Sequence, residues 1–184
     1  SKHTKGTAMT VKRTTWSPFP HANAGFDFKG AALKKAWKDL HRGDREPFPR
    51  DAELQEAWRC FHRGDFQQAV RLADEFGLAG HAVANKATGI YATYLEEDSQ
   101  RRIDCFKSAI ARAERAMQAF PDDPNSHYFH AFNLGRYSQS ISVVKALRQG
   151  VGGKILASLQ RAIALQPEHA EAHEVMLCLQ TGTV

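Results

Sequence analysis

The chain contains an internal repeat, and this feature restricts its fold more than any other. The segment LKKAWKDLHRGD at 33–44 returns as LQEAWRCFHRGD at 54–65, with seven of the twelve positions identical. In both copies large apolar residues stand at i, i+4 and i+7, the spacing that places them on one face of an α-helix. Repeated units of this kind bury their apolar faces by stacking on one another. The repeat therefore predicts stacked helices.

The rest of the chain continues the helical pattern. Apolar spacing predicts further helices at about 66–76, 80–95, 100–120, 125–137, 141–148, 154–165 and 169–179. Gly150, Gly152 and Gly153 are expected to form a flexible turn before the helix at 154. A length of 184 residues with 42% hydrophobic content allows one buried core. We therefore expect an all-α fold of antiparallel helix pairs, forming a single domain over residues 27–184.

The string His-Arg-Gly-Asp ends both copies of the repeat, at 41–44 and 62–65. An integrin ligand or a metal-binding His is one interpretation, but the chemistry of helix ends explains the string more simply. His and Arg complement the negative end of the helix dipole, Gly provides a left-handed stop, and Asp can cap a following helix. A helix can follow Asp65, whereas Pro47 and Pro49 prevent one directly after Asp44. We interpret both strings as helix ends.

Positive charge is concentrated near the start of the chain. The net charge is +5, yet residues 1–45 hold ten bases and three acids, while the other 139 residues hold 15 bases and 17 acids. Residues 1–26 contain no acid, and the sequence WSPFP at 16–20 disfavours a helix. This predicts an extended basic arm over 1–26, serving as a tether to an anionic surface or as a strap across the chain's own repeats.

Cysteine content and hydropathy indicate in which cellular compartment the protein is expected. No stretch approaches the roughly 18 consecutive apolar residues of a membrane helix, so no transmembrane segment is expected. Three widely spaced cysteines cannot form a disulfide framework, and their odd number leaves a thiol. These features favour a reducing compartment. We expect a cytoplasmic location, with the periplasm after signal removal as the alternative.

Small residues at regular positions of the helix pairs resemble the tetratricopeptide repeat. One unit has small or aromatic residues at the matching positions Ala57, Ala69, Ala73 and Phe76, and the next has Ala109, Ala113, Ala116 and Pro121. The second and third units carry insertions of 8 and 12 residues that regular arrays lack. These insertions, together with the segment LQRAIALQP at 159–167, resemble the divergent repeats of microtubule-dynamics regulators and of bacterial helical-repeat proteins associated with tripartite transporters. The resemblance implies an irregular right-handed superhelix.

No common catalytic signature is present. The segment GVGGKI at 150–155 is similar to a phosphate loop, but Arg148 stands where a Walker motif requires Gly. Ile155 stands where that motif requires Ser or Thr. We therefore expect neither an enzyme nor a cofactor.

Two His pairs have helical metal-ligand spacing. They are His127 with His130, and His169 with His173 on what we expect to be an exposed last helix. Neither pair has a clear third ligand, so packing or solvent exposure is the favoured interpretation and no metal is predicted.

The family resemblance also implies a groove lined by the first helix of each pair. The groove-facing positions carry over to Leu54, Trp58, Phe61, Val83, Lys86, Ile90, Thr93, Asn125, Tyr128 and Phe132. Aromatic residues beside a cation and amides suit the recognition of an extended or helical protein segment. For Trp58 and Phe61, an equal alternative is that the preceding repeat helix covers them.

The leading hypothesis is a non-enzymatic interaction module or scaffold that binds a peptide or helix in this groove. One alternative is a small-ligand carrier, in which the inserts close the groove into a helical pocket. A less favoured alternative is a nucleic-acid-binding protein that uses the basic N-terminal quarter, where Lys34, Lys35 and Lys38 share a helix with Trp37. Lysines on one helix face are usually only solvated.

Overall fold

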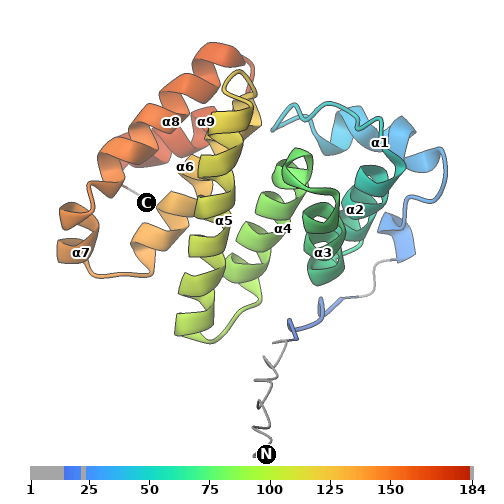
Figure 1. Cartoon of the computed structure of the whole chain (residues 1–184), viewed down its shortest axis with the longest axis horizontal. Coiled ribbons are helices and arrows are strands. Elements are labelled where there is room, and N and C mark those ends of the chain that lie inside the picture. Colours follow the sequence, from blue (N-terminus) through green and yellow to red (C-terminus); the bar gives the residue numbers. More distant parts are fainter. Residues whose placement is uncertain (1–14, 22–23, 183–184) are drawn as a thin grey trace, which may run out of the picture.

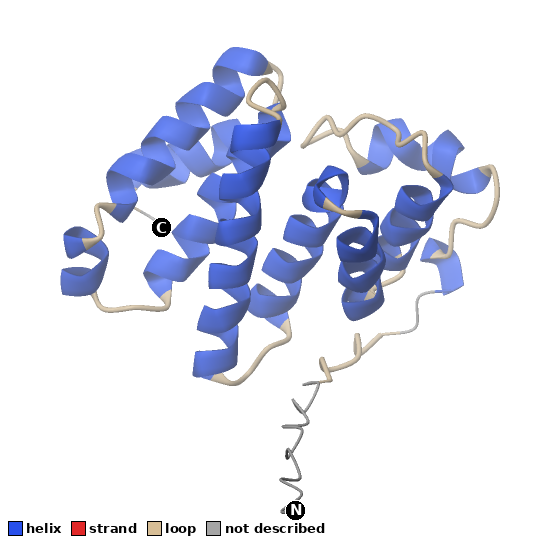
Figure 2. Cartoon of the chain, in the orientation of Figure 1, coloured by secondary structure: helices blue, strands red, loops and turns tan. Residues whose placement is uncertain are grey.

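The computed structural model describes residues 15–21 and 24–182, and over these residues the chain is all-α. They form nine α-helices and two short 3-10 turns, with no strand (Figure 1, Figure 2). The helices are α1 (Ala32–Leu40), α2 (Ala52–His62), α3 (Phe66–Phe76), α4 (His81–Tyr94), α5 (Ser99–Ala119), α6 (Pro124–Gln139), α7 (Val143–Arg148), α8 (Val151–Leu165) and α9 (Ala170–Thr181). The all-α prediction is confirmed. Within this part of the chain, no helix combines the length and apolarity needed to cross a bilayer.

Helical hairpins stack side by side to form the body of the molecule (Figure 1). Helix α2 packs on α3, α4 on α5, and α6 on α8, and α3 and α5 also pack on the next hairpin. Helix α4 contacts both α2 and α6, so the first helices of successive hairpins are neighbours. Helix α9 packs against α8, and the short α7 connects α6 to α8. This order brings side chains from α2, α4, α6 and α9 toward a common region.

Small residues allow the helices to pack closely. The fully buried alanines of the described helices are Ala57, Ala69, Ala73, Ala84, Ala87, Ala92, Ala109, Ala113, Ala116, Ala131, Ala162 and Ala172. Helices α4 and α6 meet most tightly at Gly89, where an added Cβ would lie 2.7 Å from the Phe132 ring. Since that distance is far below van der Waals contact, the crossing requires a residue without a side chain at Gly89.

The predicted helices occur where the apolar spacing placed them, and side-chain caps mark several of their starts. Asp98, Asp123 and Ser142 accept hydrogen bonds from backbone N–H groups in the first turns of α5, α6 and α7. The predicted turn at Gly152 and Gly153 is wrong, because α8 already begins at Val151. Of the three glycines only Gly150 is left-handed, with φ +62°.

The two His-Arg-Gly-Asp strings have different structures. The second ends α2 as expected: Gly64 is left-handed with φ +85°, and Asp65 directly precedes α3, although its side chain makes no capping bond. In the first string Gly43 is not left-handed, and Asp44 is 1% exposed. The first string does stand at the end of α1, with His41 as the C-cap, but the expected left-handed stop at Gly43 is wrong, and Asp44 is part of a buried polar cluster.

The segment expected to form a basic arm lies only partly within the described residues, since 1–14 and 22–23 fall outside them. Residues 15–21 contain no helix, and Ala24–Phe26 form a 3-10 turn. The Trp16 ring stacks on Tyr91 of α4 at 4.1 Å between ring centroids, and the Ser17 N–H donates to the Tyr91 hydroxyl at 3.0 Å. Trp16 lies in a hollow lined by α3, α4 and α5, apart from the predicted groove residues.

Candidate functional site

The first helices of the hairpins line one face of the stack, and the predicted groove residues divide there into two groups. One group, Lys86, Ile90, Tyr128 and Phe132, lines a groove of about 400 Å³ between α4, α6 and α9. Another, Leu54, Trp58 and Val83, lines a separate hollow that includes residues 46–49 of the chain itself. Phe61 and Thr93 are half-buried outside both sets of lining residues, and Asn125 is buried. We call the groove between α4, α6 and α9 the open half, and the hollow that includes residues 46–49 the closed half.

The repeat helix α1 and the loop after it cover the closed half. The Trp37 ring meets Trp58 edge-on at 5.5 Å between centroids and Phe48 at 5.2 Å. The Trp37 indole N–H donates to the carbonyl of Glu46 at 2.7 Å, which fixes the loop over the helix. Trp58 is 2% exposed as a result. Of the two expectations for Trp58, the structure places it under the preceding repeat helix.

Asp44 is the centre of a buried polar cluster between the loop and the helices. Its carboxylate lies 2.9 Å from His41 Nδ1 and accepts from Lys86 Nζ at 2.6 Å and from the Glu46 N–H at 3.1 Å. Burial alone would raise the pKa of Asp44, but the hydrogen bond with His41 and the charge of Lys86 outweigh it and lower the pKa below its usual range. Asp44 is therefore a buried carboxylate held ionised by its partners.

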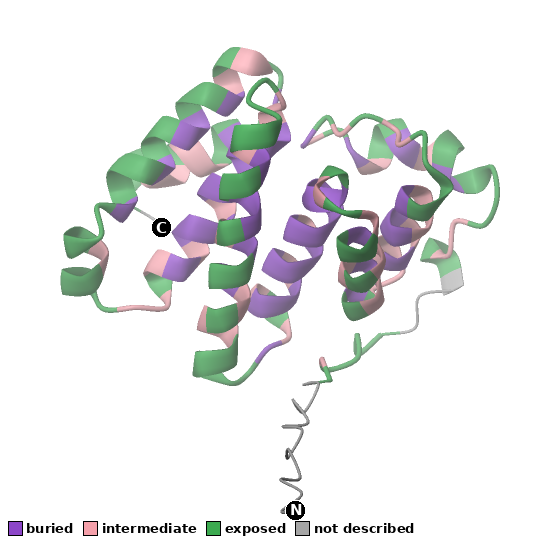
Figure 3. Ribbon diagram, viewed as in Figure 1, coloured by how far each residue is buried: buried purple, intermediate pink, exposed green. Residues whose placement is uncertain are grey.

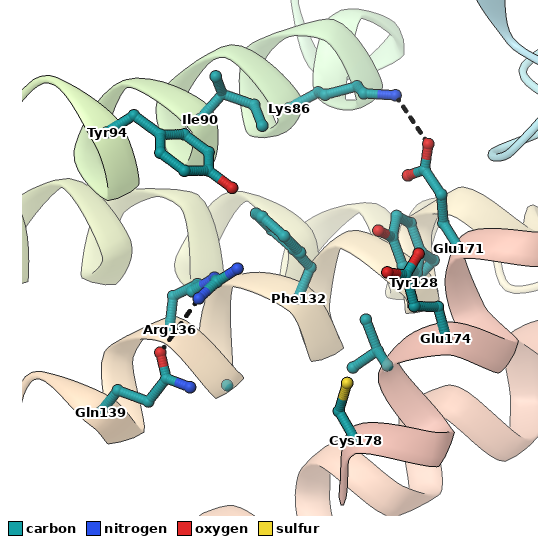
Figure 4. A pocket seen from close by; sticks show the side chains of 12 residues that line it. Lys86, Ile90, Tyr94, Tyr128, Phe132, Arg136, Gln139, Glu171, Glu174 and Cys178 are labelled. Carbon is teal, nitrogen blue, oxygen red and sulfur yellow. Dashed lines mark hydrogen bonds and ion pairs between the residues drawn. The ribbon is translucent and has the colours of Figure 1, made fainter. Parts of the chain in front are cut away.

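Lys86 joins this cluster to the last helix. Its ammonium group lies 3.3 Å from Glu171 Oε1 on α9, opposite Asp44 (Figure 4). The Glu171 N–H donates to the Gly43 carbonyl at 3.2 Å. Although burial lowers the pKa of Lys86, the Asp44 and Glu171 carboxylates raise it above its ordinary value, so Lys86 stays charged. Two carboxylates thus share one cation at the boundary between the closed and open halves.

Asn125 of α6 joins the loop after α1 to the start of α9. Its side-chain amide donates to the Asp44 carbonyl at 3.0 Å and to Glu46 Oε2 at 2.5 Å. Its amide oxygen lies 2.7 Å from His169 Nε2. His169 also accepts from the Ala172 N–H and so caps α9. Residues 43–46 are therefore attached to α4 and α6 by the side chains of Lys86 and Asn125, and to α9 by the backbone N–H of Glu171.

Neutral titratable groups surround the ionised ones. Glu46 is half-buried at the edge of the cluster, where desolvation and the nearby charge of Asp123 raise the pKa of its carboxyl to about 8. His62 Nε2 lies 3.1 Å from His41 Nε2. Burial, together with the charges of His41 and Lys86, lowers the pKa of His62 to about 3. Glu46 is therefore mostly protonated below about pH 8. His62 is mostly neutral above about pH 3. Between these two values both side chains are uncharged.

The open half has no covering segment among the described residues. Helix α4 contributes Ile90 and Tyr94, α6 contributes Phe132 and Arg136, and α9 contributes Glu174, Val175 and Cys178 (Figure 4). The Tyr94 side chain is 69% exposed. The Arg136 guanidinium lies 5.7 Å from the centre of the Phe132 ring. An apolar floor is therefore bordered by a cation on α6 and a carboxylate on α9.

The His pairs form no joint site. His127 Nε2 lies 2.7 Å from the Pro121 carbonyl, and His130 Nδ1 lies 2.7 Å from the Ser158 hydroxyl. His169 is fully buried, so its expected place on an exposed helix is wrong, while His173 is exposed and contacts the Pro167 carbonyl. No cluster of His, Cys, Asp or Glu with metal-binding geometry occurs in residues 15–21 or 24–182.

The sequence interpretation missed His41, Asp44, Glu46 and Glu171. His41 and Asp44 belong to a string that also fits a helix end, and Glu171 is on a helix that was expected to be exposed. One signal was available in the sequence. The two strings are identical, yet a helix follows directly only after the second, at Phe66. The unused Asp of the first string needed another role.

Comparison with known proteins does not identify the chain, which matches no protein-family profile, no curated protein and no solved structure.

Proposed function

We propose that this chain is a non-enzymatic interaction module that binds a peptide or a partner helix in the open half. We further propose that its hairpins form an irregular superhelix resembling tetratricopeptide repeats, with residues 1–26 as an arm. The neighbouring first helices α2, α4 and α6 support this arrangement, as do the buried alanines at the positions where that family has small residues.

The observation that carries the proposal is the uncovered apolar floor of the open half. Ile90, Phe132 and Val175 are only half-buried, and Tyr94 is largely exposed beside them. Aromatic and aliphatic residues that meet in a groove form the anchors of protein interfaces, because a partner's apolar side chain removes them from water. Arg136 and Glu174 at the borders would fix the direction of a partner with opposite charges.

The closed half offers an internal example of such recognition. There, loop residues 43–49 occupy the same face of the stack, and Asn125 and the Glu171 N–H bind the backbone carbonyls of Asp44 and Gly43. Phe48 supplies an aromatic anchor against Trp37. A face that holds its own loop through main-chain hydrogen bonds and an aromatic ring has the chemistry to hold a second segment alongside it.

An open groove suits a protein segment better than an enclosed small ligand. Tyr94, Gln139 and Glu174 line the groove and are all exposed, so a bound molecule would remain in contact with solvent along its length. Small-molecule sites usually bury most of their ligand. This contrast favours the peptide hypothesis over the carrier hypothesis.

Selection from a random peptide library tests the proposal. Peptides enriched on the wild-type protein are measured by fluorescence anisotropy against a Tyr94→Ala/Glu174→Lys variant and against Phe26→Ala as a control. The double variant changes two exposed groove residues, whereas Phe26 is a similarly exposed aromatic outside the groove. We expect at least about tenfold weaker binding to the double variant and unchanged binding to the control. Equal affinity for all three proteins, or no enriched peptide, would contradict the proposal.

A further inference from the structure

Helix α7 exposes more aliphatic surface than any role within the described fold requires. Val143 and Leu147 are each 75% exposed and Val144 is 58% exposed, and no residue of α7 is buried. The helix is at the margin of the stack between α6 and α8 (Figure 1), and its surface is almost entirely exposed (Figure 3). Exposed aliphatic side chains in a group mark a surface that contacts something apolar.

The side chains of α7 are arranged around the helix as a membrane interface requires. At about 100° per residue, Val143, Leu147 and Val144 fall within an arc of about 100°. Arg148 and Lys145 follow on one side of this arc, and both are exposed. Ala146, on the other side, is half-buried and packs against the core. The apolar arc thus faces outward while one edge carries positive charge.

The charge around α7 has one sign. Residues 143–154, which run from α7 into α8, contain three bases, Lys145, Arg148 and Lys154, and no acid. Neither Lys145 nor Arg148 forms an ion pair with any residue that the structure describes. The hollow beside α7, of about 530 Å³, is lined by apolar, glycine and neutral polar residues. The adjoining hollow that shares Val151 with it contains one carboxylate, Glu114, which lies 3.6 Å from His130.

We propose that α7 inserts Val143, Val144 and Leu147 into the surface of an anionic lipid bilayer, with Lys145 and Arg148 at the level of the headgroups. A protein partner would also cover aliphatic residues, but two exposed cations beside the apolar arc, with no acid between 143 and 154, complement a surface of uniform negative charge. Three aliphatic side chains and two cations give reversible, peripheral binding, because each term alone is small. Residues 46–184 are slightly acidic in total, but α7 and the start of α8 form a local basic surface apart from residues 1–45.

Co-sedimentation with vesicles tests this inference. The full chain is mixed with phosphatidylcholine vesicles with or without about a third phosphatidylserine, the anionic lipid whose surface potential attracts Lys and Arg. We expect binding to the anionic vesicles, and at least about tenfold weaker binding to neutral ones. A Val143→Asp/Leu147→Asp variant should lose about tenfold or more in affinity for the anionic vesicles. A Leu177→Asp variant, which changes an aliphatic residue of α9 that is 60% exposed, should bind as the wild type does.

A second pair of substitutions separates the two contributions. Lys145→Glu/Arg148→Glu keeps the aliphatic arc and should lose about tenfold or more in affinity for anionic vesicles, while its binding to neutral vesicles should not change. Because the substituted residues are exposed, circular dichroism spectra should match the wild type. Equal binding to both vesicle types, full binding by the Asp variant, or concentration-dependent self-association that the Asp variant abolishes would each overturn the inference. The last result would assign α7 to an interface between copies of the chain.

Discussion

The closed and open halves are neighbouring parts of one face, but they differ in what satisfies their side chains. In the closed half Trp58 is covered by α1 and the loop after it, and Asp44 of that loop is buried and joined to His41 and Lys86 by short hydrogen bonds. In the open half Tyr94 and Glu174 face solvent, and the described residues supply no cover. From this difference we infer that the closed half contributes to stability, and we propose that the open half is free to bind a partner. Lys86 is the boundary, since it contacts Asp44 and also lines the open half.

The largest effect should come from breaking that boundary. Lys86→Met leaves the Asp44 carboxylate buried without its cation, which should cost about 3–5 kcal/mol of unfolding free energy. Urea denaturation measures the loss. The double variant Asp44→Asn/Lys86→Met removes both charges and should recover a large part of it. If Lys86→Met is as stable as the wild type, the closed half does not depend on this ion pair.

Removing the cover of the closed half should have the next largest effect. Phe48 is half-buried against Trp37, so Phe48→Ala should cost about 2 kcal/mol, roughly half of the cost for a fully buried Phe. The same variant should expose the hollow that Leu54 and Trp58 line, and quenching of tryptophan fluorescence by acrylamide should increase. Unchanged stability and quenching would mean that the loop does not protect the closed half.

Titration of Glu46 should make the stability of the closed half depend on pH. The folded-state pKa of about 8 exceeds the ordinary 4.5, so between these values the unfolded chain loses a proton that the folded chain retains. Stability should therefore fall as pH rises through this window, by at most about 1.4 kcal/mol per pH unit. The Glu46→Gln variant has an amide at this position that does not titrate, so it lacks this pH dependence. The free energy of unfolding of the wild type minus that of Glu46→Gln should fall from about pH 5 to pH 8 and then level off.

A constant difference between these two proteins over the same pH range would show that Glu46 is ionised in the folded state. The other buried groups, including His62 with its lowered pKa, are common to both proteins, so their contributions largely cancel in the comparison.

The smallest effect on stability should occur in the open half. Tyr94→Ala changes a largely exposed side chain and should alter the unfolding free energy by less than about 0.5 kcal/mol. The same substitution should weaken peptide binding. A substantial loss of stability in urea denaturation would place Tyr94 among the structural residues and remove the contrast between the two halves.

The helices were predictable from sequence because their apolar spacing is local. The polar cluster was not, because Asp44 is 81 positions from Asn125 and 42 from Lys86, and no local pattern encodes those contacts. Of the groove residues that the family resemblance implied, Lys86, Ile90, Tyr128 and Phe132 lie together. Trp58 is instead covered, since α1 is an additional helix before the first hairpin.

Two of the three cysteines allow the most direct test of the open half, because one lines it and the other is a buried reference on α2. Cys178 lines the open half, whereas Cys60 on α2 is 1% exposed and burial raises its pKa to about 11. Alkylation by iodoacetamide, followed by mass spectrometry of each cysteine peptide, measures both sites in the wild-type protein. We expect Cys178 to react faster than Cys60, and a selected groove peptide to slow Cys178 at least about tenfold at saturation. Equal reaction at the two sites, or a Cys178 rate that the bound peptide leaves unchanged, would contradict the account.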